Sequence, residues 1–305
     1  MKSPNTFIIG APKAGTTALA TYLSQHPNAF LCYPKEPSYW STDLKQKNAN
    51  LKINTIADYE SLFSGADETT HNAVIDASTR YIMSEAAILN IVEYQPNAKF
   101  IIMLRDLVEI AYAFHMEQLF NDNEDIKDFY TAWIRQDERI SSGVYPKNCA
   151  DPKLLHYRNV VSLGTQLASV LNYVPRNQVL IIFQDDMHKN TKETYLNVTR
   201  FLGLEDYLLD EFPRHGTAHF NRFDALAKLY QSPNSFLQPI VRGLKKFVRT
   251  KLSYNFQELI KGLFIKRVGR TKLEPGVRKS IIAELTDEID LLSEITGRNL
   301  NHWKE

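Results

Sequence analysis

The stretch that decides the fold is Phe7-Ile8-Ile9-Gly10-Ala11-Pro12-Lys13-Ala14-Gly15-Thr16-Thr17. Its apolar, β-branched start predicts a buried strand that ends at Gly10. Pro12 and Gly15 mark a loop, and from Thr16 the pattern becomes helical. The backbone N–H groups of such a loop, with a helix N-terminus behind them, form a binding site for an anion. The sequence therefore predicts a strand, a phosphate-binding loop and a helix at the start of the chain.

Apolar segments alternate with helical ones up to about residue 212. The strongest strand signal is Lys99–Leu104, and further strands are expected at 29–33, 72–76 and 178–183. Helices are expected at 85–94, after Arg105, at 158–174 and at 191–203. Continuous apolar strands separated by helices predict a parallel sheet covered on both faces. We therefore expect an α/β fold, a P-loop-like three-layer α/β/α arrangement with a central parallel sheet.

Strand signals vanish after residue 212, and helical periodicity continues to residue 305. We found no Ser/Gly-rich linker at this transition. We therefore expect one domain over residues 1–305, with an α/β core at 1–212 and a helical, basic C-terminal part at 213–305.

Composition narrows the class of protein. The 305 residues carry a formal net charge of +1, which excludes a globally polybasic or polyacidic protein, and 44% of them are hydrophobic. Cys32 and Cys149 are too few for a disulfide framework or a four-thiolate metal site, and they fit a reducing compartment. No apolar run approaches the roughly 18 residues of a membrane span, and the first residues lack the anatomy of a signal peptide. We expect a soluble cytoplasmic protein with no metal, no integral membrane segment and no nucleic-acid partner.

The loop differs from that of nucleotide triphosphatases. Gly10 and Gly15 have the spacing of the glycines in GxxxxGK[ST], but Thr16 stands where the lysine belongs. The lysine lies three residues earlier, at Lys13, nearer the bond to the first phosphate than to a γ-phosphate. Taken alone, the loop also fits a plain turn in which Lys13 is a solvated charge.

This loop resembles the 5′-phosphosulfate loop of sulfotransferases that use 3′-phosphoadenosine-5′-phosphosulfate (PAPS). Other segments resemble the family in the same order, above all its heparan-sulfate-like and bacterial members. They are Lys35-Glu36-Pro37-Ser38-Tyr39-Trp40, Asp76-Ala77-Ser78-Thr79-Arg80-Tyr81, Phe100–Arg105 with Asp106-Leu107-Val108, Val179–Phe183 with Asp185-Asp186-Met187, Phe201-Leu202-Gly203-Leu204, and Gly297-Arg298-Asn299-Leu300 with Trp303. The resemblance spans nearly the whole chain.

The resemblance implies that the sulfuryl group of PAPS passes to a hydroxyl of a saccharide or small-molecule acceptor, leaving adenosine 3′,5′-bisphosphate (PAP). Such a displacement needs a phosphate cradle, a cation at the leaving oxygen and a base, and it needs no metal. The cradle is expected at Ala14, Gly15, Thr16 and Thr17, and the cation at Lys13.

Glu36 is the expected base, because it aligns with the glutamate that related sulfotransferases use. A carboxylate needs partial desolvation to act as a base near neutral pH, and Pro37, Tyr39 and Trp40 are expected to supply it. His115 is the second candidate. The residues expected to bind the acceptor are Lys35, Tyr39, Trp40, Asp76 and Tyr81.

Arg105 is expected to bind the 3′-phosphate, because it follows a parallel strand at the edge where α/β sheets bind ligands. Two positions depart from the family pattern. Ala113 stands where a serine is usual, and Ile110 where a second arginine is common. We therefore expect either another donor or weaker binding of the nucleotide.

The segment 242–272 holds ten basic residues against one acid, Glu258. It is interpreted either as a solvated helical face over an apolar stripe or as a rim that attracts an anionic ligand. In the second case Arg267 and Arg270 are expected to reach the nucleotide. A role at a membrane surface is a further interpretation.

Three alternatives stay open. The same chemistry serves N-sulfation of an amine or guanidine acceptor. A P-loop kinase or NTPase needs a lysine at the end of the loop and a strand-terminal Asp for Mg²⁺. A non-enzymatic basic module predicts salt-dependent binding to DNA or liposomes. The acceptor and the oligomeric state are open as well.

Overall fold

The computed structural model describes residues 3–45, 53–213, 219–221, 265–267 and 273–305, and side chains in all of these except 219–221 and 265–267. The chain forms two compact units. The first comprises residues 1–111, 157–216 and 274–305, and the second comprises residues 112–156 and 217–273. Each unit is described by itself.

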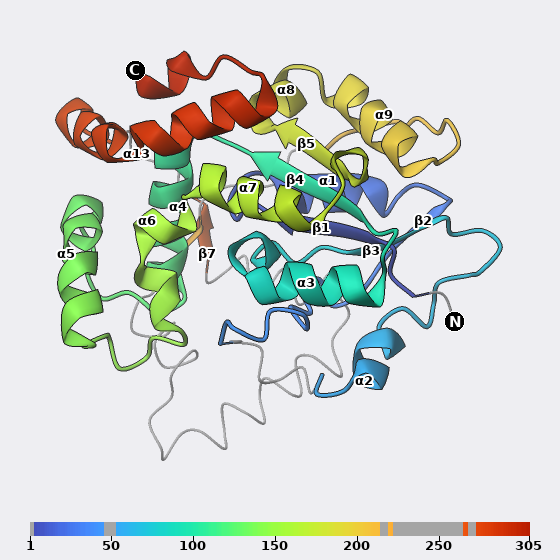
Figure 1. The fold of residues 1–305 in the computed structure, drawn as a ribbon, viewed down its shortest axis with the longest axis horizontal. Helices are drawn as coiled ribbons and strands as arrows, with labels where there is room; N and C mark the ends of the chain where they lie inside the picture. The colour runs from blue at the N-terminus through green and yellow to red at the C-terminus, as the bar shows by residue number, and fades with distance from the viewer. Residues whose placement is uncertain (1–2, 46–52, 214–218, 222–264, 268–272) are drawn as a thin grey trace. The chain divides into compact units, whose positions relative to one another are not determined.

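The first unit contains a five-stranded sheet in which every neighbouring pair is parallel (Figure 1). Its spatial order is β2-β3-β1-β4-β5. The strands are β1 (Thr6–Gly10), β2 (Ala29–Leu31), β3 (Ala73–Asp76), β4 (Lys99–Leu104) and β5 (Val179–Phe183). Strands β1 and β3 are buried throughout, which explains their unbroken apolar character. The predicted parallel sheet is confirmed.

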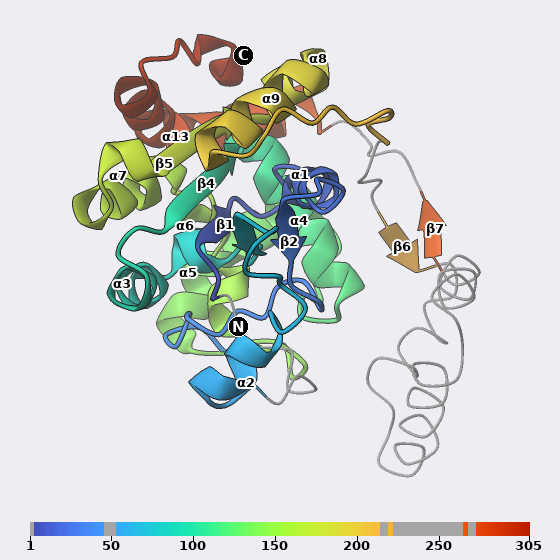
Figure 2. The same ribbon diagram turned by 90° about the vertical axis from the view of Figure 1, so that its right-hand side faces the viewer.

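Helices cover both faces of this sheet. α1 (Thr16–Leu23) and α9 (Thr191–Leu202) pack together on one face, and α3 (Glu85–Tyr94) and α7 (Leu163–Tyr173) pack together on the other (Figures 1 and 2). The expected three-layer α/β/α fold is therefore confirmed. Shorter helices of this unit are α2 (Ile56–Ser61), η1 (Tyr81–Met83), α6 (Tyr157–Val160), η3 (Arg176–Gln178) and α8 (Gln184–Lys189).

The helix ends follow from local sequence. The Ser84 hydroxyl accepts a hydrogen bond from the Ala87 N–H and starts α3, and Gly203 ends α9 with φ 70°. The helix predicted at 158–174 is instead broken into α6 and α7. Ser162 lies at the break, and its hydroxyl donates to the Arg158 carbonyl, a side-chain bond that competes with the helical pattern.

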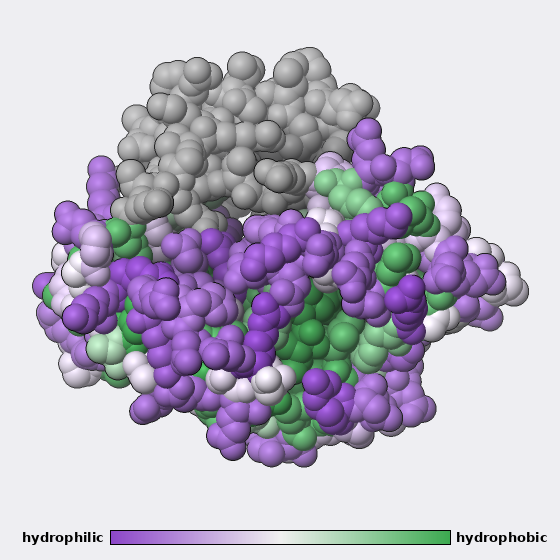
Figure 3. Space-filling view, turned by 90° about the horizontal axis from the view of Figure 1, so that it is seen from above, coloured by the Kyte–Doolittle hydropathy of each residue, from purple (hydrophilic) through white to green (hydrophobic). Residues whose placement is uncertain are grey.

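The C-terminal helix α13 (Pro275–Thr296) packs on α7 through a stripe of buried residues, Ile281, Ile282, Leu285, Ile289 and Leu292. It ends at Gly297 with φ 67°. Among the described residues seen in Figure 3, most of the surface is hydrophilic, and hydrophobic residues show only in limited areas. The 3₁₀ turn η4 (Asn301–Lys304) follows and buries Trp303.

Two ion pairs fasten this helical part to the sheet. Arg298 pairs with Asp186 of α8 and lies 4.1 Å from the Phe183 ring centroid. The Arg278 Nη2 donates to Asp106 Oδ2 (2.6 Å) directly after β4. Asp106 also caps the next helix, α4 (Leu107–Phe120). The sequence pattern at Gly297–Trp303 thus has a structural role.

Two short strands lie beyond residue 212, where no strand was expected. β6 (His219–Asn221) and β7 (Ile265–Arg267) pair antiparallel in the second unit. Three residues are too few to show an alternating pattern, so the sequence carried no signal. The rest of the second unit that the structure describes includes α5 (Phe129–Ser142) and η2 (Pro152–Leu155). Within the described ranges, no helix has the length and apolar character needed to cross a bilayer.

Candidate active site

The loop after β1 has the backbone of an anion site. Gly15 adopts φ 97°, a left-handed conformation that favours glycine, and α1 starts at the next residue. The first N–H groups of α1 have no partner inside the helix, and the positive end of the helix dipole adds to their attraction for anions. Thr16 is buried and Thr17 is exposed. The loop therefore offers backbone and hydroxyl donors at the expected positions.

Gly10 is required for a different reason. A Cβ atom at this position would lie 2.5 Å from Ile82 Cγ2 and 3.2 Å from the Thr79 carbonyl oxygen. The start of the phosphate loop thus lies directly against the turn that follows β3. This close approach joins the two segments that the sequence marked as donor-binding and acceptor-binding.

Lys13 lies in this loop with φ 64° and is half-buried. Its carbonyl oxygen accepts a hydrogen bond from Arg105 Nη1 (3.1 Å). Arg105 in turn pairs with Glu109, four residues further along, at 2.8 Å. The Arg105 side chain therefore ties the end of β4 to the loop, and Glu109 orients it. The i,i+4 spacing of this pair is a signal that we missed in the sequence.

Glu36 lies at the surface of the same sheet edge. Its carboxylate pairs with Lys35 Nζ (2.7 Å) and accepts a hydrogen bond from Thr79 Oγ1 (3.4 Å). The structure therefore brings Lys35, Glu36 and the turn after β3 together. The Glu36 side chain is 41% exposed. Its carboxylate is therefore partly shielded from solvent.

The aromatic neighbours of Glu36 pack elsewhere. The rings of Tyr39 and Tyr59 stack with centroids 4.9 Å apart, and Trp40 contacts Tyr59 and Tyr94 at 5.1 and 4.7 Å. Trp40 is 8% exposed, whereas Tyr39 is half-buried. The interpretation of Trp40 as an acceptor contact is at odds with this burial, because its ring fills an aromatic cluster. Only Tyr39 retains exposed surface.

Asp76 and Tyr81 also differ from expectation. Both side chains are 0% exposed. Asp76 accepts hydrogen bonds from Ser78, Tyr59 and Tyr81 at 2.7, 2.8 and 2.9 Å. Residues buried in this way do not face an acceptor. They contact the Lys35–Trp40 segment from the protein interior instead, Tyr81 directly and Asp76 through Ser78. Nothing in the sequence indicated that Tyr59 contacts Asp76, since the two residues lie 17 positions apart.

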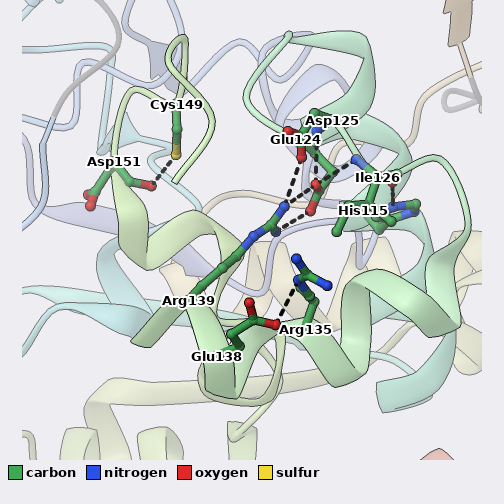
Figure 4. A network of polar contacts seen from close by, with 9 residues as sticks. All are labelled: His115, Glu124, Asp125, Ile126, Arg135, Glu138, Arg139, Cys149 and Asp151. Carbon is green, nitrogen blue, oxygen red and sulfur yellow. Dashed lines mark hydrogen bonds and ion pairs between the residues drawn. The ribbon is translucent and has the colours of Figure 1, made fainter. Parts of the chain in front are cut away.

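His115, the second candidate base, lies in the second unit and is 1% exposed. Its Nε2 is 2.9 Å from the Ile126 carbonyl oxygen, and burial lowers the pKa of its ring. Figure 4 shows it beside the buried Glu124–Arg139 ion pair, whose two contacts are both 2.7 Å. A ring held in this way fits a structural role better than proton transfer with an acceptor.

The sequence analysis did not single out Gln184, which lies beside the loop at Gly15. A Cβ atom at Gly15 would lie 3.5 Å from Gln184 Nε2, so this amide borders the loop from the end of β5. Its position directly after a strand was the available signal. Ile110 and Ala113, which replace the family's arginine and serine, are both buried apolar residues of α4. Arg270 lies outside the described residues, as does the side chain of Arg267.

The fold is that of an α/β protein with a glycine-containing strand–loop–helix turn at the carboxyl edge of a parallel sheet. Residues 3–215 match the sulfotransferase domain family, and the chain belongs to this family. Human carbohydrate sulfotransferase 15 is 25% identical over 246 residues, which cover 66% of this chain and 44% of that protein. Human bifunctional heparan sulfate N-deacetylase/N-sulfotransferase 3 is 27% identical over 203 residues, which cover 66% and 22% respectively. The chain thus spans less than half the length of these curated relatives.

Among solved structures, a sulfotransferase from Alicyclobacillus acidocaldarius matches 100% of both chains with a TM-score of 0.72 and 22% identity. This likeness confirms the fold.

Proposed function

We propose that the chain transfers the sulfuryl group of PAPS to a hydroxyl of a saccharide or small-molecule acceptor and releases PAP. One observation carries this proposal. The loop that holds Lys13 abuts the Thr79 turn, and Thr79 Oγ1 reaches the Glu36 carboxylate. This proximity supports the proposal that a phosphate cradle, a cation and a carboxylate share one edge of the sheet.

Each part supplies one requirement of the displacement. The acceptor oxygen forms a bond to sulfur while the bond from sulfur to the 5′-phosphate oxygen breaks. Glu36 takes the acceptor's proton, and Lys13 matches the charge that develops on the leaving oxygen. The N–H groups of Gly15, Thr16 and Thr17, with Ala14 beside them, hold the 5′-phosphate. Lys35 pairs with Glu36 in the free protein, and acceptor binding would replace that contact.

Arg105 is proposed to bind the 3′-phosphate of the donor. Its position after β4 and its anchor to Glu109 favour this role. Arg267 and Arg270 belong to the proposal on sequence grounds alone. We also propose that residues 1–305 act as a single sulfotransferase domain.

The proposed class of acceptor is inferred from the curated relatives of this chain. Carbohydrate and heparan sulfate sulfotransferases favour a saccharide, with Lys35 and Tyr39 as the residues that face it. The name of the second relative also keeps N-sulfation as an alternative. A glutamate base suits a hydroxyl better, because a neutral amine needs less help to attack.

A kinase is disfavoured by Asp76. The carboxylate that ends β3 is fully buried and accepts three hydroxyl hydrogen bonds, so it does not present oxygens to a solvated Mg²⁺.

The test has a binding arm and a transfer arm. Calorimetry with PAP and with Mg²⁺–ATP distinguishes the two nucleotide classes, and we expect heat from PAP. Labelled PAPS is then offered with panels of saccharide hydroxyls and amines, and the labelled product is analysed. Binding of Mg²⁺–ATP without any binding of PAP at millimolar concentration would overturn the proposal.

A further inference from the structure

We propose that Asp76 is a positioning residue for sulfuryl transfer, because it holds the Lys35–Trp40 segment, and with it Glu36, through two hydroxyl relays. The inference rests on the proposed role of Glu36 as the base. It assigns to a buried carboxylate a function that involves no contact with the acceptor.

The first layer of contacts surrounds the Asp76 carboxylate. Ser78 Oγ donates to Oδ1 (2.7 Å), while Tyr59 and Tyr81 both donate to Oδ2 (2.8 and 2.9 Å). These three donors come from the turn after β3, from α2 and from η1. The carboxylate thereby fixes the direction of three O–H bonds.

The second layer reaches the Lys35–Trp40 segment. The Ser38 N–H donates to Ser78 Oγ (3.1 Å), and the Trp40 N–H donates to Tyr81 Oη (3.4 Å). A hydroxyl that gives its only hydrogen to Asp76 turns its lone pairs toward these amides. Ionised Asp76 therefore orients both hydroxyls as acceptors for the segment that carries Glu36.

The segment needs such support. Glu36 and Ser38 adopt φ 62° and 53°, in the left-handed region that is unfavourable for residues other than glycine. Such a conformation persists only where surrounding contacts determine it. The relays hold Ser38 and Trp40, which follow Pro37, and Thr79 holds the Glu36 carboxylate, which precedes it.

The relays depend on the charge of Asp76. Burial raises the pKa of its carboxyl to about 6, and the groups that face it are Tyr59, Tyr81, Cys32 and Glu36. Burial raises the pKa of both tyrosines and of the Cys32 thiol, so these three stay protonated. A proton on Asp76 makes the carboxyl a donor, and it then competes for the oxygens that accept from the segment. Transfer is therefore expected to fall as the pH drops below about 6.

The experiment compares Asp76→Asn, Tyr81→Phe and Ser78→Ala with the wild-type chain. Misplacement of a catalytic group by about 1 Å costs up to 10²-fold in rate. We expect kcat to fall about 10-fold or more in each variant while the dissociation constant of PAP stays unchanged. In Asp76→Asn, kcat is expected to show no further fall as the pH drops below about 6. Tyr81→Phe, which retains the Asp76 carboxyl, is expected to show the same fall as the wild type. Tyr195→Phe is the control, since Tyr195 is also a buried tyrosine (1% exposed) and lies on α9.

A second readout does not depend on activity. Hydrogen exchange of the Ser38 and Trp40 amides is expected to accelerate in Asp76→Asn and to stay slow in Tyr195→Phe. If Asp76→Asn does not fold, Tyr81→Phe and Ser78→Ala carry the test alone. Wild-type kcat together with unchanged amide exchange in these two variants overturns the inference. If the wild-type chain shows no turnover of PAPS, while exchange of the Ser38 and Trp40 amides still accelerates in the variants, the proposed function is refuted instead.

Discussion

At the scale of single residues, Lys13 and Glu36 share an unusual feature. Both are non-glycine residues with positive φ, and each is held by a neighbouring side chain. Arg105 holds the Lys13 carbonyl, and Thr79 holds the Glu36 carboxylate. Strained backbone at the two proposed catalytic residues fits a site whose geometry is fixed before the substrates bind.

Removal of the cation tests the first of these residues. Lys13→Ala is expected to lower kcat about 10²–10³-fold, because charge on the leaving oxygen goes unmatched. Steady-state kinetics with labelled PAPS measures this. Lys192→Ala is the control, since Lys192 is an exposed lysine of α9. Similar rates for the two variants would contradict the role of Lys13.

The base is tested by Glu36→Gln. This variant is expected to lose transfer and to retain PAP binding in calorimetry, because only proton removal is affected. His115→Ala is expected to lower thermal stability through the cavity it leaves, with kcat changed little. The reverse pattern would assign the base to His115.

At the scale of elements, the strand–loop–helix unit could be read from the sequence because each part has a local cause. Apolar runs produced the strands, and Gly10 and Gly15 marked the loop. The site behind it could not be read in the same way. The Asp76 contacts join α2, β3 and η1, and no spacing along the chain predicts that Tyr59 meets Asp76. Burial of Trp40 is likewise a result of packing against α2 and α3, which lie far from it in the sequence.

The glycine at the start of α1 gives a prediction at this scale. Gly15→Ala is expected to cost about 1 kcal/mol in free energy of unfolding, because its φ of 97° strains any residue with a Cβ. It should also weaken PAP binding, since this loop is the proposed site for the 5′-phosphate. Gly143→Ala is a matched control: Gly143 has φ 68°, ends α5 and has open space around its Cβ position. Denaturant unfolding should show similar losses for both variants, and only Gly15→Ala should alter the calorimetric titration.

At the scale of the whole molecule, the contribution of Asp76 to stability and its contribution to activity are expected to respond to pH in opposite directions. The pKa of Asp76 rises from 3.8 to about 6 on folding. The folded state therefore binds this proton more tightly, so the contribution of Asp76 to the free energy of unfolding is present at acid pH and is lost as the pH rises through 6.

This linkage is measurable by urea unfolding at two pH values. The difference in unfolding free energy between wild type and Asp76→Asn should shift in favour of wild type by about 1 kcal/mol from pH 7.5 to pH 5. Activity of the wild type should fall over the same interval. A parallel fall of stability and activity would show that acid inactivation is ordinary unfolding.

The aromatic cluster beside the site has a spectroscopic consequence. Trp40, one of three tryptophans in the chain, belongs to the segment that carries Glu36 and contacts Tyr59 and Tyr94. Replacement of Trp133 and Trp303 by phenylalanine would leave a single indole emitter there. Its fluorescence would then report, without any label, each rearrangement of this segment during turnover.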